Sequence, residues 1–199
     1  MKPIKLLSIL IIPYLFIPAI SNNLETIHGY TLPPEPDLIA NNATLGGVDS
    51  NDNGVRDDVE RAIYKKYNKK LYVVILMDRT KFYQRTLVEP TKNAKIIQKD
   101  ATKIIDCRLH LSSSDKNLKY SNFKIHINYI EDLIFNNKER ILKYYNYNKA
   151  LSGGVYGSSI SDWNIKSCSS EIVKVLEEMK KWKKLFRKIN SGICNLIRQ

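Results

Sequence analysis

Apolar residues recur at helical spacing over most of this chain. Between Arg56 and Tyr67, the apolar residues Val59, Ile63 and Tyr67 lie four positions apart. Residues three and four apart share one face of an α-helix, so this spacing predicts an amphipathic helix. The same pattern predicts further helices over residues 71–88, 90–111, 123–147 and 171–189.

Two of these segments are locally ambiguous. Residues 71–77 form a continuous apolar run that would suit a buried strand. No turn and partner strand follow the run, so we expect a helix there. The segment 123–147 contains the pair Asn136-Asn137, which favours a weak point inside this helix.

The last predicted helix, residues 171–189, is strongly amphipathic. Its apolar stripe consists of Ile172, Leu176, Met179, Trp182, Phe186 and Ile189, and its cations Lys174, Lys181, Lys184, Arg187 and Lys188 lie mostly away from that stripe. We expect the stripe to pack on the protein core. The alternative is that this basic helix lies on an anionic membrane with Trp182 and Phe186 inserted.

The first 47 residues follow a different pattern. Residues 1–21 combine a cationic start, the apolar run Leu6–Ile20 and small residues at a cleavage point, which predicts a signal peptide and a secreted or periplasmic protein. This run is shorter than the roughly 20 residues of a membrane anchor, and two prolines interrupt it. Residues 22–47 contain Pro33, Pro34, Pro36 and paired glycines, which predict an extended arm.

These elements predict an all-α domain over residues 48–199. We expect an irregular bundle of about five helices, preceded by the extended Pro-rich arm and a metal-binding loop. The formal charge of the whole chain is +12, and loss of Lys2 and Lys5 with the leader would lower it by two. Such a charge favours solubility, and the sequence contains no recognised nucleic-acid-binding module.

Export would make the three cysteines candidates for oxidation. If Cys168 and Cys194 flank one continuous helix, the 26 residue steps from one to the other span about 39 Å, beyond the reach of a disulfide. Cys107 is then the shared partner. We favour Cys107 with Cys168, because Cys194 lies in an apolar turn where a buried thiol is stable. A Cys107–Cys194 bridge and three unpaired thiols remain alternatives.

Residues Asp49 to Glu60 form the most informative segment. Their sequence, DSNDNGVRDDVE, matches the pattern D-x-[DN]-x-[DN]-G-x5-E at every specified position. Five of the twenty acidic residues of the chain lie within these twelve positions. Carboxylates this close together repel one another unless a cation lies among them, so the segment predicts a Ca²⁺ site.

The segment resembles the calcium loop of EF-hand proteins residue by residue. The resemblance implies the ligands Asp49, Asn51, Asn53, the Val55 carbonyl, Asp57 directly or through water, and a bidentate Glu60, with a bend at Gly54 and Asp58 as a spare carboxylate. No helix is predicted before the loop, and Arg56 replaces the aliphatic residue of paired EF-hands.

The loop is therefore closer to the single loops of dockerin-like and thrombospondin-type-3-like repeats. With residues 34–37, it also resembles the opening of small exported bacterial proteins of unassigned function. The alternative is a turn without metal, in which Asp57, Asp58 and Glu60 suit the positive end of the following helix.

The sequence favours a binding or structural role over catalysis. Its three histidines, His28, His110 and His126, belong to no catalytic motif, and neither a G-x-S-x-G elbow nor an H-E-x-x-H motif occurs. We expect an exported protein with a structural Ca²⁺ ion and an acidic envelope component or an anionic membrane as partner. The alternative is a secreted hydrolase, which a histidine and a carboxylate within hydrogen-bond reach in a pocket would favour.

Overall fold

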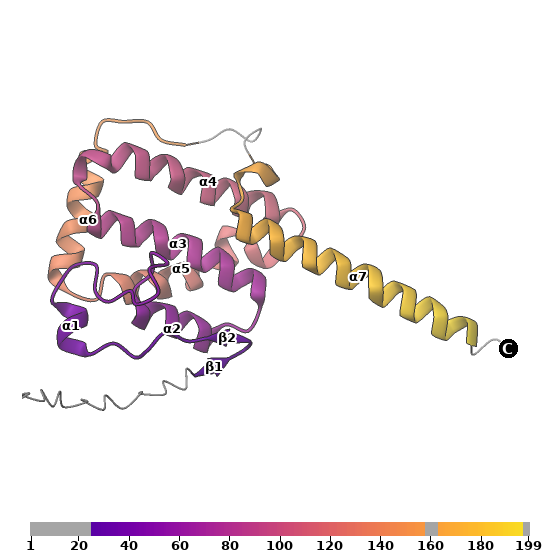
Figure 1. The fold of residues 1–199 in the computed structure, drawn as a ribbon. Helices are drawn as coiled ribbons and strands as arrows, with labels where there is room; N and C mark the ends of the chain where they lie inside the picture. The colour runs from indigo at the N-terminus through magenta and orange to yellow at the C-terminus, as the bar shows by residue number, and fades with distance from the viewer. Residues whose placement is uncertain (1–24, 158–162, 197–199) are drawn as a thin grey trace, which may run out of the picture.

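The computed structural model describes residues 25–157 and 163–196, with the side chains of the last helix described as far as Arg187. The expected signal peptide, residues 1–21, lies outside this range, as do the side chains of Ile189 and Cys194. Seven helices and one two-stranded ribbon make up the described elements (Figure 1). The predicted mainly helical class is confirmed, with more helices than the five expected. No described helix combines the length and the apolar content needed to cross a membrane.

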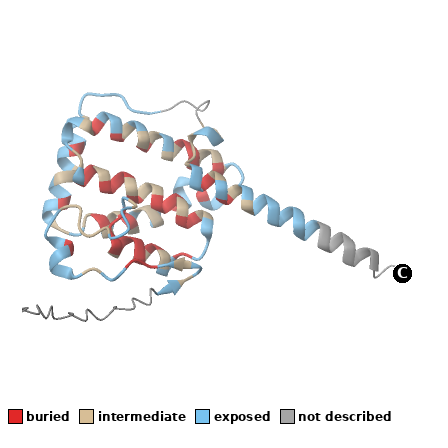
Figure 2. Cartoon of the chain, viewed as in Figure 1, coloured by how far each residue is buried: buried red, intermediate tan, exposed pale blue. Residues whose placement is uncertain are grey.

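Helix α3 is the centre of the bundle. It runs over Lys70–Val88 and packs against α2 (Asp57–Lys66), α4 (Ala94–Ser112), and three later helices. At about 100° per residue, its buried residues cover an arc of about 220°, which explains the continuous apolar run at its start; Figure 2 shows buried segments along the length of the helix. The helix prediction for this run is confirmed, and the strand alternative is wrong.

The segment predicted as one helix over residues 123–147 forms two. Helix α5 spans Tyr120–Ile134 and α6 spans Lys138–Ala150, so the expected weak point at Asn136-Asn137 is a complete break. The Asn137 side chain accepts a hydrogen bond from the Arg140 amide at 2.9 Å and thereby caps α6. The described residues also form three short 3-10 helices, which are η1 (Thr91–Asn93), η2 (Lys116–Leu118) and η4 (Ile165–Ser167).

The expected extended arm is partly folded. Strands β1 (Thr26–Ile27) and β2 (Tyr30–Thr31) pair antiparallel, and α1 covers Leu38–Asn42. Leu32, between them, is completely buried. The prolines exclude long elements but permit these short ones, and burial of Leu32 stabilises the folded arm.

The last helix, α7 (Ser170–Leu196), is fixed at its start and projects away from the bundle (Figure 1). The predicted disulfide Cys107–Cys168 is confirmed, with an S–S distance of 2.00 Å, and it ties α4 to the residue pair before α7. Ile172 is buried, whereas Trp182 and Phe186 are exposed. The prediction that the whole apolar stripe packs on the core is therefore wrong, because the core ends after the first turns of α7 (Figure 2).

Candidate functional site

The loop 49–56 makes a tight turn and leads directly into α2. The Asp57 amide donates to the Val48 carbonyl at 2.8 Å, which closes the base of the loop. Gly54 has a φ of 82°, in the left-handed region that favours glycine, so the bend expected at this position is present. Asp52 also lies in the left-handed region, with a φ of 54°. The backbone thus bends sharply inside the segment that the sequence singled out.

The first acidic residue of the loop holds this bend. The Asp49 carboxylate accepts hydrogen bonds from the amides of Asn53 at 3.1 Å and Gly54 at 2.8 Å. The Asn53 side-chain oxygen in turn accepts from the Val55 amide at 2.9 Å. These contacts face the interior of the loop, so short polar side chains and backbone amides meet there.

Glu60 points back toward the loop from the first turn of α2. Its side-chain oxygen Oε2 accepts hydrogen bonds from the amide nitrogens of Asn51 at 3.1 Å and Asn53 at 2.7 Å. Glu60 is only 2 % exposed. Burial, followed by the charge and hydrogen bond of Glu60, raises the pKa of Tyr64, which lies one turn later. Asp49, Asn51, Asn53 and Glu60 therefore form one connected cluster.

The other two residues of the predicted ligand set are placed differently. Both oxygens of Asp57 accept from the Ser50 amide, at 3.0 and 3.2 Å, and Asp57 is 1 % exposed. The Asp57 carboxylate is thus hydrogen-bonded to the loop backbone and does not belong to the cluster around Glu60. The Val55 side chain is completely buried in the core, so its backbone carbonyl is the group that could act as a ligand in the loop.

Asp58, expected to be a spare carboxylate, forms an ion pair with Arg56. The Arg56 guanidinium contacts its two oxygens at 2.5 and 3.1 Å and also donates to the Leu133 carbonyl at 2.7 Å. Arg56 is completely buried. Arg56, which replaces the aliphatic residue of paired EF-hands, therefore attaches the start of α2 to α5.

A second buried guanidinium, missed by the sequence analysis, holds the arm that enters the loop. Arg140 of α6 is completely buried and donates to five oxygen atoms. They are the carbonyls of Asn41, Thr44 and Leu45 and the side-chain oxygens of Asn42 and Asn136. Burial, and then the charge of Arg56, lowers the pKa of Arg140. Nothing in the local sequence around residue 140 indicates contacts almost 100 residues away.

The oxygen atoms of the loop fit a hard divalent cation better than a soft metal. Across residues 25–157 and 163–187, no three His, Cys, Asp or Glu side chains are grouped so as to hold a metal ion. The loop instead brings the carboxylates of Asp49 and Glu60 beside two asparagine amides, an all-oxygen set of the kind that Ca²⁺ takes. Asn51 and Asn53 turn their NH₂ groups toward Glu60, so an ion there requires both amides to rotate and present oxygen.

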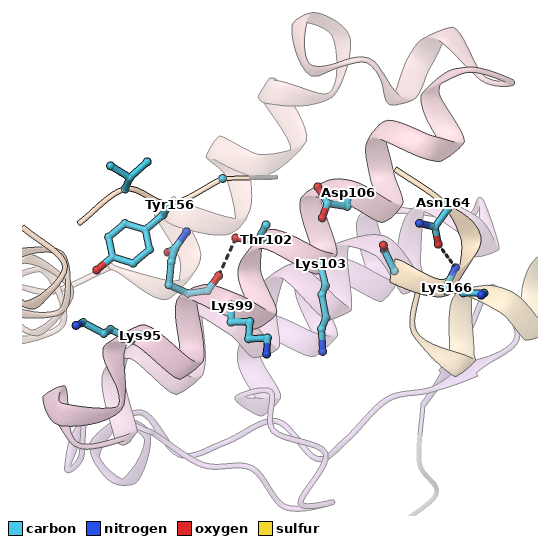
Figure 3. A pocket seen from close by; sticks show the side chains of 12 residues that line it. Lys95, Lys99, Thr102, Lys103, Asp106, Tyr156, Asn164 and Lys166 are labelled. Atoms are coloured by element: carbon cyan, nitrogen blue, oxygen red, sulfur yellow. Dashed lines mark hydrogen bonds between the residues drawn. The ribbon is translucent and has the colours of Figure 1, made fainter. Parts of the chain in front are cut away.

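A groove of about 480 Å³ lies elsewhere, along α4. Lys95, Lys99 and Lys103 follow one another on the helix at four-residue steps, and Lys166 of η4 also lines the groove (Figure 3). All four lysines are exposed. The Lys103 ammonium lies 3.8 Å from the Asp100 carboxylate, a partial neutralisation. This lysine groove can attract an anion, although each exposed lysine contributes little.

The contact described for His126 is to a tyrosine hydroxyl, and not to the carboxylate that would favour the hydrolase alternative. His126 Nδ1 lies 3.1 Å from the Tyr67 hydroxyl, and burial followed by the charge of Lys66 lowers the pKa of His126. Comparisons with protein-family models, with curated proteins and with solved structures find no match for this chain.

Proposed function

We propose that this chain is an exported protein whose loop 49–60 binds Ca²⁺ as a structural ion. One observation carries the proposal. The carboxylates of Asp57 and Glu60 are almost completely buried. In the described part of the chain, neither they nor Asp49 forms an ion pair with Lys or Arg, although the chain has 32 such residues. Buried carboxylates without a positive partner are costly, and a bound cation would remove that cost.

The charge and number of the oxygen atoms support Ca²⁺ in particular. Asp49 and Glu60 would supply the negative charge, and Asn51, Asn53 and the Val55 carbonyl would supply neutral oxygens. Asp57 would contribute through water, because its carboxylate is held by the Ser50 amide. Ca²⁺ takes six to eight oxygens in flexible geometry, whereas Mg²⁺ demands a near-ideal octahedron. A loop whose amides must first rotate suits the more tolerant ion.

The ion would strengthen a connection that already exists. The loop joins the arm, held by Arg140, to α2, held by Arg56. Single loops of extracellular type bind Ca²⁺ with dissociation constants of about 0.1–1 mM. At about 5 mM Ca²⁺ such a site adds about 1–2 kcal/mol to the free energy of unfolding. The metal is thus structural and no switch.

Thermal unfolding of chelated protein with added Ca²⁺ or Mg²⁺ tests the site. We expect about 5 mM Ca²⁺ to raise the melting temperature by about 2–8 °C, and Mg²⁺ to raise it less. Glu60→Gln should abolish the rise, and Asp132→Asn, which removes an exposed acid of α5, should preserve it. No Ca²⁺ effect on the unaltered protein would leave only a helix-capping turn. Export is tested separately by the mass of the secreted chain, which should lack residues 1–21.

The lysine groove supports a second candidate role, binding of an acidic polymer at the cell envelope. Like charges at four-residue steps on one helix face repel one another, so the row Lys95, Lys99, Lys103 costs stability that a polyanion would return. Poly-glutamate should bind weakly and lose binding with salt. Replacement of the three lysines by Gln should remove the interaction. Unchanged binding would exclude the groove.

A further inference from the structure

The outer part of α7 exposes an apolar stripe that no part of the described chain covers. The salt bridge between Lys70 and Glu178, at 2.6 Å, is the last side-chain contact described between α7 and the bundle. Beyond it, Trp182 and Phe186 are 61 % and 60 % exposed, and Met179 and Leu185 are also exposed. Figures 1 and 2 show this part of the helix standing clear of the other helices.

Cations surround this stripe on the rest of the helix surface. At about 100° per residue, Met179, Trp182, Leu185 and Phe186 fall within an arc of about 120°. Residues 179–187 contain five basic side chains and no acidic one: Lys180, Lys181, Lys183, Lys184 and Arg187. Lys181 and Lys183 lie about 40° outside the two edges of the arc. Their long stems can follow the apolar stripe while their ammonium groups stay in water.

This distribution of charge selects among possible partners. A second copy of the chain would bring five further cations against these five, and a stripe of about two turns is short for a coiled coil, which needs three or four heptads. An anionic lipid surface matches both the apolar stripe and the cations beside it. Trp, Phe and Leu side chains partition into the boundary between headgroups and acyl chains, and lysines lie at the phosphates.

We propose that residues 179–187 of α7 form an attachment site for an anionic membrane surface, with the helix axis in the plane of the bilayer and Trp182, Leu185 and Phe186 inserted. Two contacts with the bundle fix the direction of this helix. The Cys107–Cys168 disulfide and the Lys70–Glu178 ion pair hold its start, so the exposed part stands away from the bundle and reaches a flat surface. The site is independent of the Ca²⁺ loop.

Tryptophan fluorescence of the full chain tests the inference at the residue concerned. Trp163→Phe leaves Trp182 as the single tryptophan, so its signal is separate from any membrane contact of the N-terminal segment. Vesicles of phosphatidylglycerol and phosphatidylcholine should shift the emission of Trp182 to the blue, and brominated lipids should quench it. Phosphatidylcholine alone should give no shift at the same lipid concentration.

Two charge-matched variants in the Trp163→Phe background separate the α7 site from the general charge of the protein. Each lysine close to an anionic surface strengthens binding about fivefold. Lys180→Gln with Lys184→Gln should therefore weaken binding about 25-fold, whereas Lys138→Gln with Lys149→Gln, two exposed lysines of α6, should leave it unchanged. Equal losses in both variants, or Trp182 emission that anionic vesicles do not alter, would overturn the proposal. A blue shift that grows with protein concentration in the absence of lipid would also overturn it, in favour of self-association.

Discussion

Replacement of Arg140 by Met isolates the contribution of one buried side chain to the docking of the arm. Methionine fills a similar volume, so the change removes the charge and five hydrogen bonds with little loss of packing. The bonds run from α6 to Asn41, Asn42, Thr44, Leu45 and Asn136 at 2.6–3.3 Å. The variant therefore asks whether this guanidinium holds the arm in place.

The expected magnitude follows from which acceptors can reach water. Asn42, Thr44 and Asn136 are exposed and can turn to solvent, but Asn41 is 4 % exposed and Leu45 is half-buried. Each buried acceptor left without a partner costs about 1–3 kcal/mol. The two carbonyls that stay shielded thus predict a loss of about 4 kcal/mol, or about 8–16 °C in melting temperature for a chain of this size.

Urea unfolding followed by circular dichroism measures the loss, with Lys149→Met on the same helix as the control. This exposed lysine should change the free energy of unfolding by less than about 0.5 kcal/mol. Hydrogen exchange should locate the effect, because the Val48 amide, bonded to the Asn41 side chain, should exchange faster in the Arg140 variant. A loss below about 1 kcal/mol, or unchanged exchange at Val48, would refute the assignment of Arg140 as the anchor of the arm.

Three further predictions concern the disulfide, a histidine and a glycine. Replacing Cys107 and Cys168 by Ala should lower the free energy of unfolding by about 4 kcal/mol, as measured in urea, since the bridge closes a loop of 61 residues; a loss near zero would contradict the entropic argument. The pKa of His126 is lowered from 6.5, so the unfolded chain takes up a proton at higher pH than the folded one does. The contribution of His126 to stability is therefore complete above about pH 6.5 and is lost as the pH falls through the folded pKa. The melting temperature of the His126→Gln variant should depend less on pH over this acidic range. An equal pH dependence in both proteins would show that His126 does not cause it. Gly47→Ala should lower the melting temperature more than Gly153→Ala does. Both glycines have a positive φ, but only at Gly47 would the new Cβ lie 2.1 Å from Cδ of Arg56. Equal melting temperatures of the two variants would show that this clash relaxes at no cost.

The helices and the loop could be predicted because local spacing and local chemistry specify them. Four-residue apolar steps predict α2 whatever surrounds it. Asn136-Asn137 predicts a weak point, which the structure shows as a break before α6, because asparagine hydrogen-bonds the backbone. Gly54 takes a positive φ where a residue with a Cβ would be strained. The length of a single helix excluded a Cys168–Cys194 bridge, and the apolar turn around Cys194 favoured the observed pair, Cys107 with Cys168.

Contacts between distant segments decided the rest. The prolines of the arm forbid long elements, but its docking depends on Arg140, whose acceptors lie almost 100 residues earlier. In the sequence, Arg56 is only a departure from the pattern of paired EF-hands. Only the fold places the Leu133 carbonyl where the buried Arg56 guanidinium can donate a hydrogen bond to it.

The two halves of α7 show the same division. The sequence by itself determined that Ile172, Trp182 and Phe186 share a stripe, because helical periodicity is local. Only the tertiary structure decided that the bundle covers the first of them and leaves the others exposed, because burial depends on where neighbouring helices end.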